Sequence, residues 1–127
     1  MKTINQTLGI LAFLVLLGCS VLKSKEVKQA ENKMNFTFSK LNKDGLTKDR
    51  KTSLAFEFCI PNEPEFLDKV KSIDESLAIY MSSTGRIGCE ENQILCIGET
   101  KGMDYKNVLI SLTKLPYVKS INESFFE

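Results

Sequence analysis

Cysteines are the residues of this 127-residue chain whose side chains are the most reactive, and there are four, Cys19, Cys59, Cys89 and Cys96. Thiolates act as nucleophiles, metal ligands and disulfide partners. The chain contains no histidine, which excludes serine–histidine and cysteine–histidine catalysis and every histidine-ligated metal site. It has no Cys-x-x-Cys pair either. We therefore expect a structural disulfide, and we expect neither a bound metal nor a cofactor.

The pairing of the three cysteines beyond the first twenty residues stays open on sequence grounds. One disulfide leaves one thiol over, and three pairings exist. The most local pairing joins Cys89 to Cys96 across a hairpin, and a second joins Cys59 to Cys96 on neighbouring strands. A thiol-dependent redox or metal-carrier protein using Cys59, Cys89 and Cys96 is the functional alternative to a structural disulfide.

Carboxylates gather in two places, near a predicted helix and in a predicted hairpin. General acid–base catalysis needs one carboxyl group in a desolvated cleft. The pattern instead places these side chains opposite the apolar stripe of the helix or in a turn, where they are solvated. We therefore predict that the protein is not an enzyme. The carboxylates concerned are Glu63, Glu65, Asp68, Asp74, Glu75, Glu90 and Glu91.

The hairpin connection also contains Ser83, Thr84 and Arg86, with Gly85 and Gly88 around the arginine. Such a loop could present the arginine and backbone N–H groups to a carboxylate or a phosphate. It lacks the spacing of a P-loop and of a dinucleotide-binding fingerprint. A β-bulge or a flexible hairpin connection is the simpler interpretation.

Several strands and two helices are predicted to position these residues. Apolar alternation predicts strands over residues 34–39, 53–60, 77–81 and 93–97, and a less regular strand over 118–126. Apolar stripes predict helices that start near Pro64 and at the N-cap Asp104, the second ending before Pro116. The order β-α-β-β-α-β after the first strand indicates an α+β fold of the ferredoxin-like kind, with both helices on one face of an antiparallel sheet.

The strand over residues 53–60 has two distinct faces. Its core face is predicted to contain the larger apolar side chains, Leu54, Phe56, Phe58 and Ile60. The other face is predicted to be exposed, and a protein partner could meet it or an open strand edge. That face consists of Ala55, Glu57 and Cys59.

The first twenty residues combine a basic start with an apolar run of about ten residues, which is too short to span a membrane but has the length of a signal-peptide core. Leu16-Leu17-Gly18-Cys19 resembles the lipobox of bacterial lipoprotein precursors. The resemblance implies that residues 1–18 are a signal peptide and that Cys19 is acylated and anchors the protein to the bilayer. Ser20 resembles the outer-membrane sorting pattern, which implies the periplasmic side of the outer membrane in a Gram-negative host.

Charge divides the remaining chain. Residues 20–51 have nine basic and four acidic side chains, a net charge of +5, whereas residues 52–127 have seven and twelve, a net charge of −5. The whole chain is near neutral at +1, which argues against a nucleic-acid partner. Residues 19–33 are polar and lysine-rich and are predicted to be a flexible tether. The tether would be drawn to anionic headgroups and would hold the domain, residues 34–127, off the membrane.

Together these features predict a membrane-anchored bacterial lipoprotein of the cell envelope. Its small non-enzymatic α+β module would bind an envelope partner, either a protein or peptidoglycan. The alternatives are the thiol-dependent redox or metal-carrier protein, and an inhibitor or immunity lipoprotein that covers its partner with an acidic face.

Overall fold

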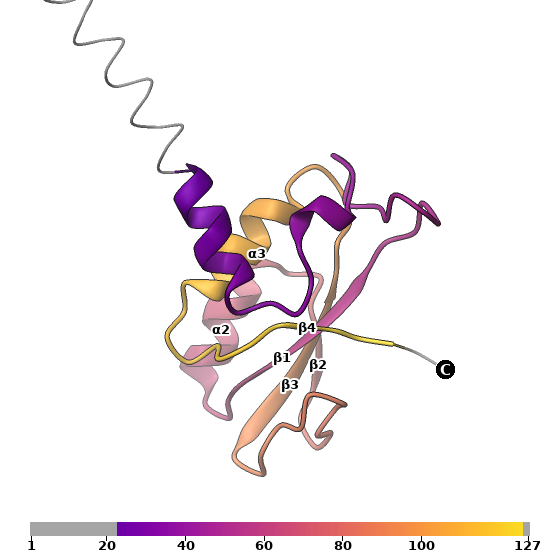
Figure 1. The fold of residues 1–127 in the computed structure, drawn as a ribbon. Coiled ribbons are helices and arrows are strands. Elements are labelled where there is room, and N and C mark those ends of the chain that lie inside the picture. Colours follow the sequence, from indigo (N-terminus) through magenta and orange to yellow (C-terminus); the bar gives the residue numbers. More distant parts are fainter. Residues whose placement is uncertain (1–22, 126–127) are drawn as a thin grey trace, which may run out of the picture.

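The computed structural model describes residues 23–125 and contains a four-stranded sheet with two helices against one face (Figure 1). The predicted signal peptide and Cys19 lie outside the described residues. A helix over residues 23–31 and the 3-10 helix η1 (Phe38–Lys40) precede the sheet. The remaining elements, in chain order, are β1 (Ala55–Pro61), α2 (Pro64–Ile73), β2 (Ala78–Tyr80), β3 (Gln93–Glu99), α3 (Tyr105–Thr113) and β4 (Asn122–Glu123).

The strand order is β2-β3-β1-β4, and every neighbouring pair is antiparallel. This order, with α2 and α3 on one face, confirms the predicted ferredoxin-like α+β arrangement (Figure 1). The central pair aligns seven residues of β1 with seven of β3, and in this register Phe58 lies opposite Cys96. Among residues 23–125, no helix has the length and apolar character that a bilayer crossing requires.

The core fills the space between the sheet and the two helices. Alternate residues of β1 and β3 point into it, and α2 and α3 contribute their predicted stripes. Gly98 of β3 allows close packing here, because an added Cβ would lie 2.5 Å from the ring of Phe56. The fully buried members include Phe58, Ile60, Val70, Leu109 and Leu112.

The predicted strand over residues 34–39 is wrong, although its two phenylalanines are buried. Met34 makes only an isolated bridge to Ile121, and the chain turns at once into η1. The carboxylate of Glu31 accepts a hydrogen bond from the backbone N–H of Phe38 (2.9 Å), which favours the turn. Apolar alternation therefore identified the core residues here but not the backbone conformation. The last predicted strand is likewise reduced to the two residues of β4.

The structure also differs from the predicted flexible tether, because residues 23–31 form a helix that packs on the domain. Ala30 is 2% exposed, and Val27 contacts the core. The Nζ of Lys33 donates hydrogen bonds to the carbonyl oxygens of Leu115 (3.2 Å) and Val118 (2.9 Å). Spacings of three and four residues place Val27, Ala30 and Met34 on one side of the chain, a stripe that the lysine-rich composition conceals. The folded domain therefore begins before residue 34.

Ala30 offers a test of whether this helix belongs to the folded domain. We expect Ala30→Glu to lower the free energy of unfolding by about 3 kcal/mol, because it places an unpaired charge against the core. The matched control Gln29→Glu adds the same charge at an exposed position and should change the free energy by about 0.5 kcal/mol or less. Urea unfolding of the two variants measures both values, and equal small effects would mean that the segment does not pack.

Candidate functional site

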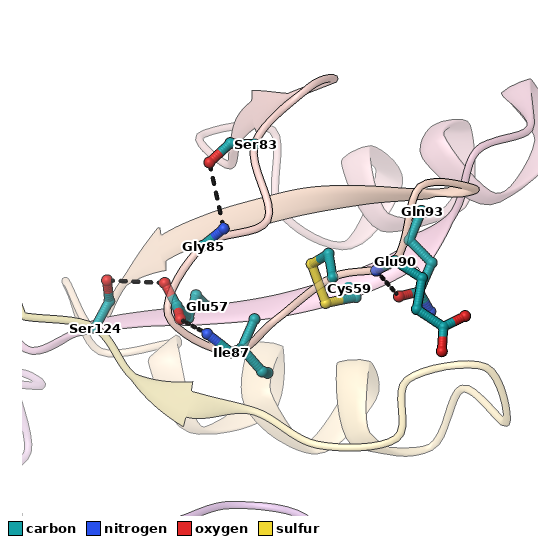
Figure 2. The surroundings of a disulfide bond; sticks show 9 residues. Glu57, Cys59, Ser83, Gly85, Ile87, Glu90, Gln93 and Ser124 are labelled. Carbon is teal, nitrogen blue, oxygen red and sulfur yellow. Dashed lines mark hydrogen bonds between the residues drawn. A yellow bond between two sulfur atoms is a disulfide. The ribbon is translucent and has the colours of Figure 1, made fainter.

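The connection between β2 and β3, residues 81–92, folds back over the face of the sheet that the helices leave open (Figure 2). Its contact with that face is close. An added Cβ on Gly85 would lie 2.7 Å from the side chain of Leu95, and the backbone there has a φ of +62°, which favours glycine. Leu95 alternates with the core-facing Ile94 and Cys96 of β3, so its side chain points away from the helices. We call residues 81–92 the clamped loop.

A disulfide between Cys59 and Cys89 ties the clamped loop to β1, with a Cα–Cα distance of 5.6 Å. Both pairings favoured from the sequence, Cys89 with Cys96 and Cys59 with Cys96, are therefore wrong. The reason is the alternation of side chains along a strand. Cys96 lies opposite Phe58 and points toward the helices, whereas Cys59 lies one residue further along β1 and points toward the loop.

Glu57 provides the second attachment of the clamped loop to the sheet. Its side chain is 2% exposed. The Oε1 atom accepts a hydrogen bond from the backbone N–H of Ile87 (2.5 Å), and the Oε2 atom accepts one from the hydroxyl of Ser124 (3.1 Å), as Figure 2 shows. A buried carboxylate is stable only with such donors. One side chain thus holds the loop and the chain after β4 together.

The two attachments share one spacing. Glu57 and Ile87 are 30 residues apart, and so are Cys59 and Cys89. The loop therefore follows β1 over two residues in the same direction, and both contacts lie on the same face of the strand. The face of Ala55, Glu57 and Cys59 was predicted to be exposed. That prediction is wrong, because the loop covers Glu57.

Alternation within one strand carries no information about a loop that returns from another part of the chain. The available signal was Glu57 itself, a single charge in the middle of a strand flanked by two phenylalanines.

The residues predicted as a ligand loop, Ser83, Thr84 and Arg86, are exposed on the clamped loop. Five backbone N–H groups of the loop are hydrogen-bonded within the domain. Those of Gly88 and Cys89 donate to the carbonyl oxygen of Thr84 at 3.1 Å and 2.7 Å. Other N–H groups donate to side chains, to Ser83 from Gly85, to Glu57 from Ile87, and to Gln93 from Glu90 (Figure 2). These five N–H groups are therefore not available as a cradle of donors for an anion.

A groove of about 450 Å³ lies along the clamped loop. Met81, one of its lining residues, keeps 54% of its surface exposed. The groove therefore combines one exposed apolar side chain with hydroxyl and carboxylate groups. The groove is lined by Met81, Ser82, Ser83, Thr84, Cys89, Glu90, Glu91 and Gln93.

The predicted carboxylates of the first helix do not join this groove. Glu63, Glu65 and Asp68 are exposed on α2 or at its start. Asp74 ends that helix, and its side chain accepts hydrogen bonds from the backbone N–H and the hydroxyl of Ser76 at 2.9 Å and 2.6 Å. It therefore stabilises the turn into β2.

Cys96 is a free thiol in the core, on the opposite face of the sheet from the disulfide. Burial raises the pKa of this thiol to about 12, so it is protonated at neutral pH. The structure therefore does not bring the three cysteines together. Within residues 23–125, no group of three or more cysteine and carboxylate side chains converges where a metal ion could bind.

The attachment through Glu57 can be tested by removing its charge alone. We expect Glu57→Gln to lower the free energy of unfolding by about 1–3 kcal/mol, because the amide accepts at only one of its two ends and so leaves one donor without its partner. The control is Glu99→Gln, which removes a carboxylate that forms only an exposed ion pair with Lys101. It should cost about 0.5 kcal/mol or less. Equal losses in urea unfolding would contradict the role assigned to Glu57.

The buried thiol predicts a specific dependence of stability on pH. The pKa of Cys96 is about 12 in the folded protein against about 9.0 for an ordinary thiol. Its stabilising contribution is complete below pH 9 and is lost as the pH rises toward 12. Between these two pH values the Cys96 thiol is ionised in the unfolded chain but still protonated in the folded protein. Between pH 9 and 11, the free energy of unfolding should fall by about 1.4 kcal/mol per pH unit more steeply than that of Cys96→Ala. Parallel urea titrations measure the difference, and equal slopes would place Cys96 in solvent or in a disulfide.

Comparison with known proteins gives no relative from which a function could be transferred. Neither the protein-family models, nor the curated proteins, nor the solved structures that we compared with this chain give a match. A function for this protein therefore has to be inferred from its own residues and geometry.

Proposed function

We propose that this protein is a lipid-anchored component of the bacterial cell envelope whose α+β domain binds another envelope protein through the clamped loop. The single observation that carries the binding role is the construction of this loop. It is joined to β1 by a disulfide and by the carboxylate of Glu57. Its outward side chains, Ser82, Ser83, Thr84 and Arg86, remain exposed.

A loop whose backbone is already attached to the sheet is suited to binding, because it loses less conformational entropy when a partner binds. The same loop is poorly suited to acid–base catalysis, since its carboxylates Glu90 and Glu91 are exposed and a catalytic carboxyl group needs a desolvated site. These observations support binding over chemistry.

The chemistry of the groove indicates the kind of partner. Met81 offers apolar surface in the groove, and Glu90 and Glu91 add two negative charges to its lining. A protein segment that combines an apolar side chain with lysine or arginine complements this surface. An inhibitor or immunity role would be one form of this binding. Peptidoglycan is the other envelope partner that the hydroxyl-rich part of the loop could contact.

The anchor is supported by the sequence Leu16-Leu17-Gly18-Cys19. Acylated Cys19 would hold the protein on the periplasmic side of the outer membrane in a Gram-negative host. A disulfide such as Cys59–Cys89 forms and persists in that oxidising compartment. The thiol-dependent alternative has less support, because Cys96 is buried away from the other two cysteines.

Photo-crosslinking in intact cells tests the binding role. A photoreactive residue at Thr84 should give one protein adduct of defined mass after illumination, and the same residue at Asp68, exposed on α2, should give none. Reversing the charges with Glu90→Lys and Glu91→Lys should reduce the adduct by about tenfold, because the complementary charges then repel. The control reversal Glu63→Lys and Glu65→Lys on α2 should leave its yield unchanged.

Two outcomes would contradict a protein partner at this loop. Equal adducts from Thr84 and Asp68 would mean that no specific surface is involved. An adduct that stays with purified sacculi, and is released by a glycan hydrolase, would identify peptidoglycan as the partner. Circular dichroism of each variant establishes that a lost adduct does not reflect unfolding.

A further inference from the structure

We infer that the helix over residues 23–31 docks the domain directly onto anionic phospholipid headgroups and thereby turns the clamped loop away from the membrane. The inference rests on the anchoring proposed at Cys19 and adds to it a second membrane contact and a fixed orientation. It replaces the flexible spacer predicted from the sequence with a rigid, basic, membrane-facing surface.

The length of chain between the anchor and the domain supports this contact. Lys23, the first described residue of the helix, is only four residues after Cys19. Four residues span at most about 14 Å when fully extended. The helix cannot swing out to lengthen this link without losing its packing, because Ala30 is buried and Glu26 forms an ion pair with Lys114 of 2.7 Å. The side of the domain that bears the helix is therefore held near the bilayer surface.

The surface of this helix has the chemistry that anionic lipids require. A shallow groove of about 560 Å³ runs between the helix and the start of α3, and three lysines line it, Lys23, Lys28 and Lys106. Ammonium groups near a membrane surface attract the phosphates of anionic lipids, and each lysine contributes a similar amount to the free energy of binding. The Nζ of Lys106 lies 5.5 Å from the centre of the Phe38 ring, a cation–π contact that helps to position it.

The acidic side chain in the groove does not cancel this charge. Among residues 23–125, Glu31 is the only carboxylate that lines it. Its Oε1 atom accepts the backbone N–H of Phe38 at 2.9 Å, so this oxygen is directed toward the domain. Val27 contributes an apolar side chain to the lining of the groove. The groove therefore has a net positive charge, which fits a layer of anionic headgroups.

The clamped loop lies far from the helix over residues 23–31 (Figure 1). The helix over residues 23–31 lies at the upper end of the molecule in Figure 1, and the connection between β2 and β3 lies at the lower end. Docking through the helix would place this connection, with Glu90 and Glu91, at the side farthest from the lipid. Repulsion between these carboxylates and an anionic surface favours the same orientation. The proposed partner site would then face the periplasm.

Lysine footprinting tests the contact on the native protein. The protein is purified from bacterial membranes and placed in vesicles of phosphatidylcholine, with or without phosphatidylglycerol, and is then acetylated briefly. Mass spectrometry should show acetylation of Lys23, Lys28 and Lys106 about fivefold slower in the anionic vesicles. The exposed Lys69 and Lys119 should react equally in both. Salt at about 0.5 M should abolish the protection, because it screens the attraction.

Matched variants separate this contact from general adhesion. In Lys23→Gln with Lys28→Gln, Lys106 should lose its protection, whereas Lys69→Gln with Lys119→Gln should leave that protection intact. Equal acetylation in the two kinds of vesicle, or protection of Lys69 and Lys119 instead, would overturn the inferred docking. The mass of the amino-terminal peptide tests the anchor in the same sample. An acylated Cys19 with unprotected lysines would overturn docking alone, and an unacylated Cys19 would overturn both.

Discussion

The hydrogen bond between the buried carboxylate of Glu57 and the backbone of Ile87 is the interaction on which the second face of the sheet depends. It fixes the return path of the loop over β1. Ile87 and Cys89 are two positions apart, as are Glu57 and Cys59, so the same alignment brings the two sulfur atoms together. In a chain whose disulfide has not yet formed, this alignment would present Cys89 to Cys59 and leave Cys96 on the other face.

The ferredoxin-like arrangement could be predicted from the sequence because its information is local. Phe56, Phe58 and Ile60 alternate along one strand, and Val70 and Leu109 belong to stripes of helical period. The pairing of the cysteines could not be predicted, since it depends on which face each strand residue occupies relative to a neighbour. Only the register that sets Phe58 opposite Cys96 shows that Cys96 points away from both other cysteines.

Neither the candidate site nor the first helix could be predicted from the sequence, because each depends on contacts between distant parts of the chain. Glu57 was predicted to face solvent, although its carboxylate contacts Ile87 and Ser124 and lies close to Gly85. The segment over residues 23–31 has the composition of a tether, yet a few small apolar residues suffice to pack it, since Ala30 needs little space. Composition describes a segment in isolation, and here the neighbours decide its structure.

The charge division of the chain acquires a physical meaning once the helix is placed. A basic tether and an acidic domain would leave the orientation of the domain unspecified, because a flexible link transmits no direction. A helix that packs on the domain fixes the orientation of its basic surface relative to the rest of the domain. Its ion pair between Glu26 and Lys114, at the end of α3, and its buried Ala30 connect the basic surface to the domain, and the disulfide connects β1 to the loop. In the docked orientation that we propose, a constraint on Lys23 and Lys28 would therefore be passed through the domain to the clamped loop.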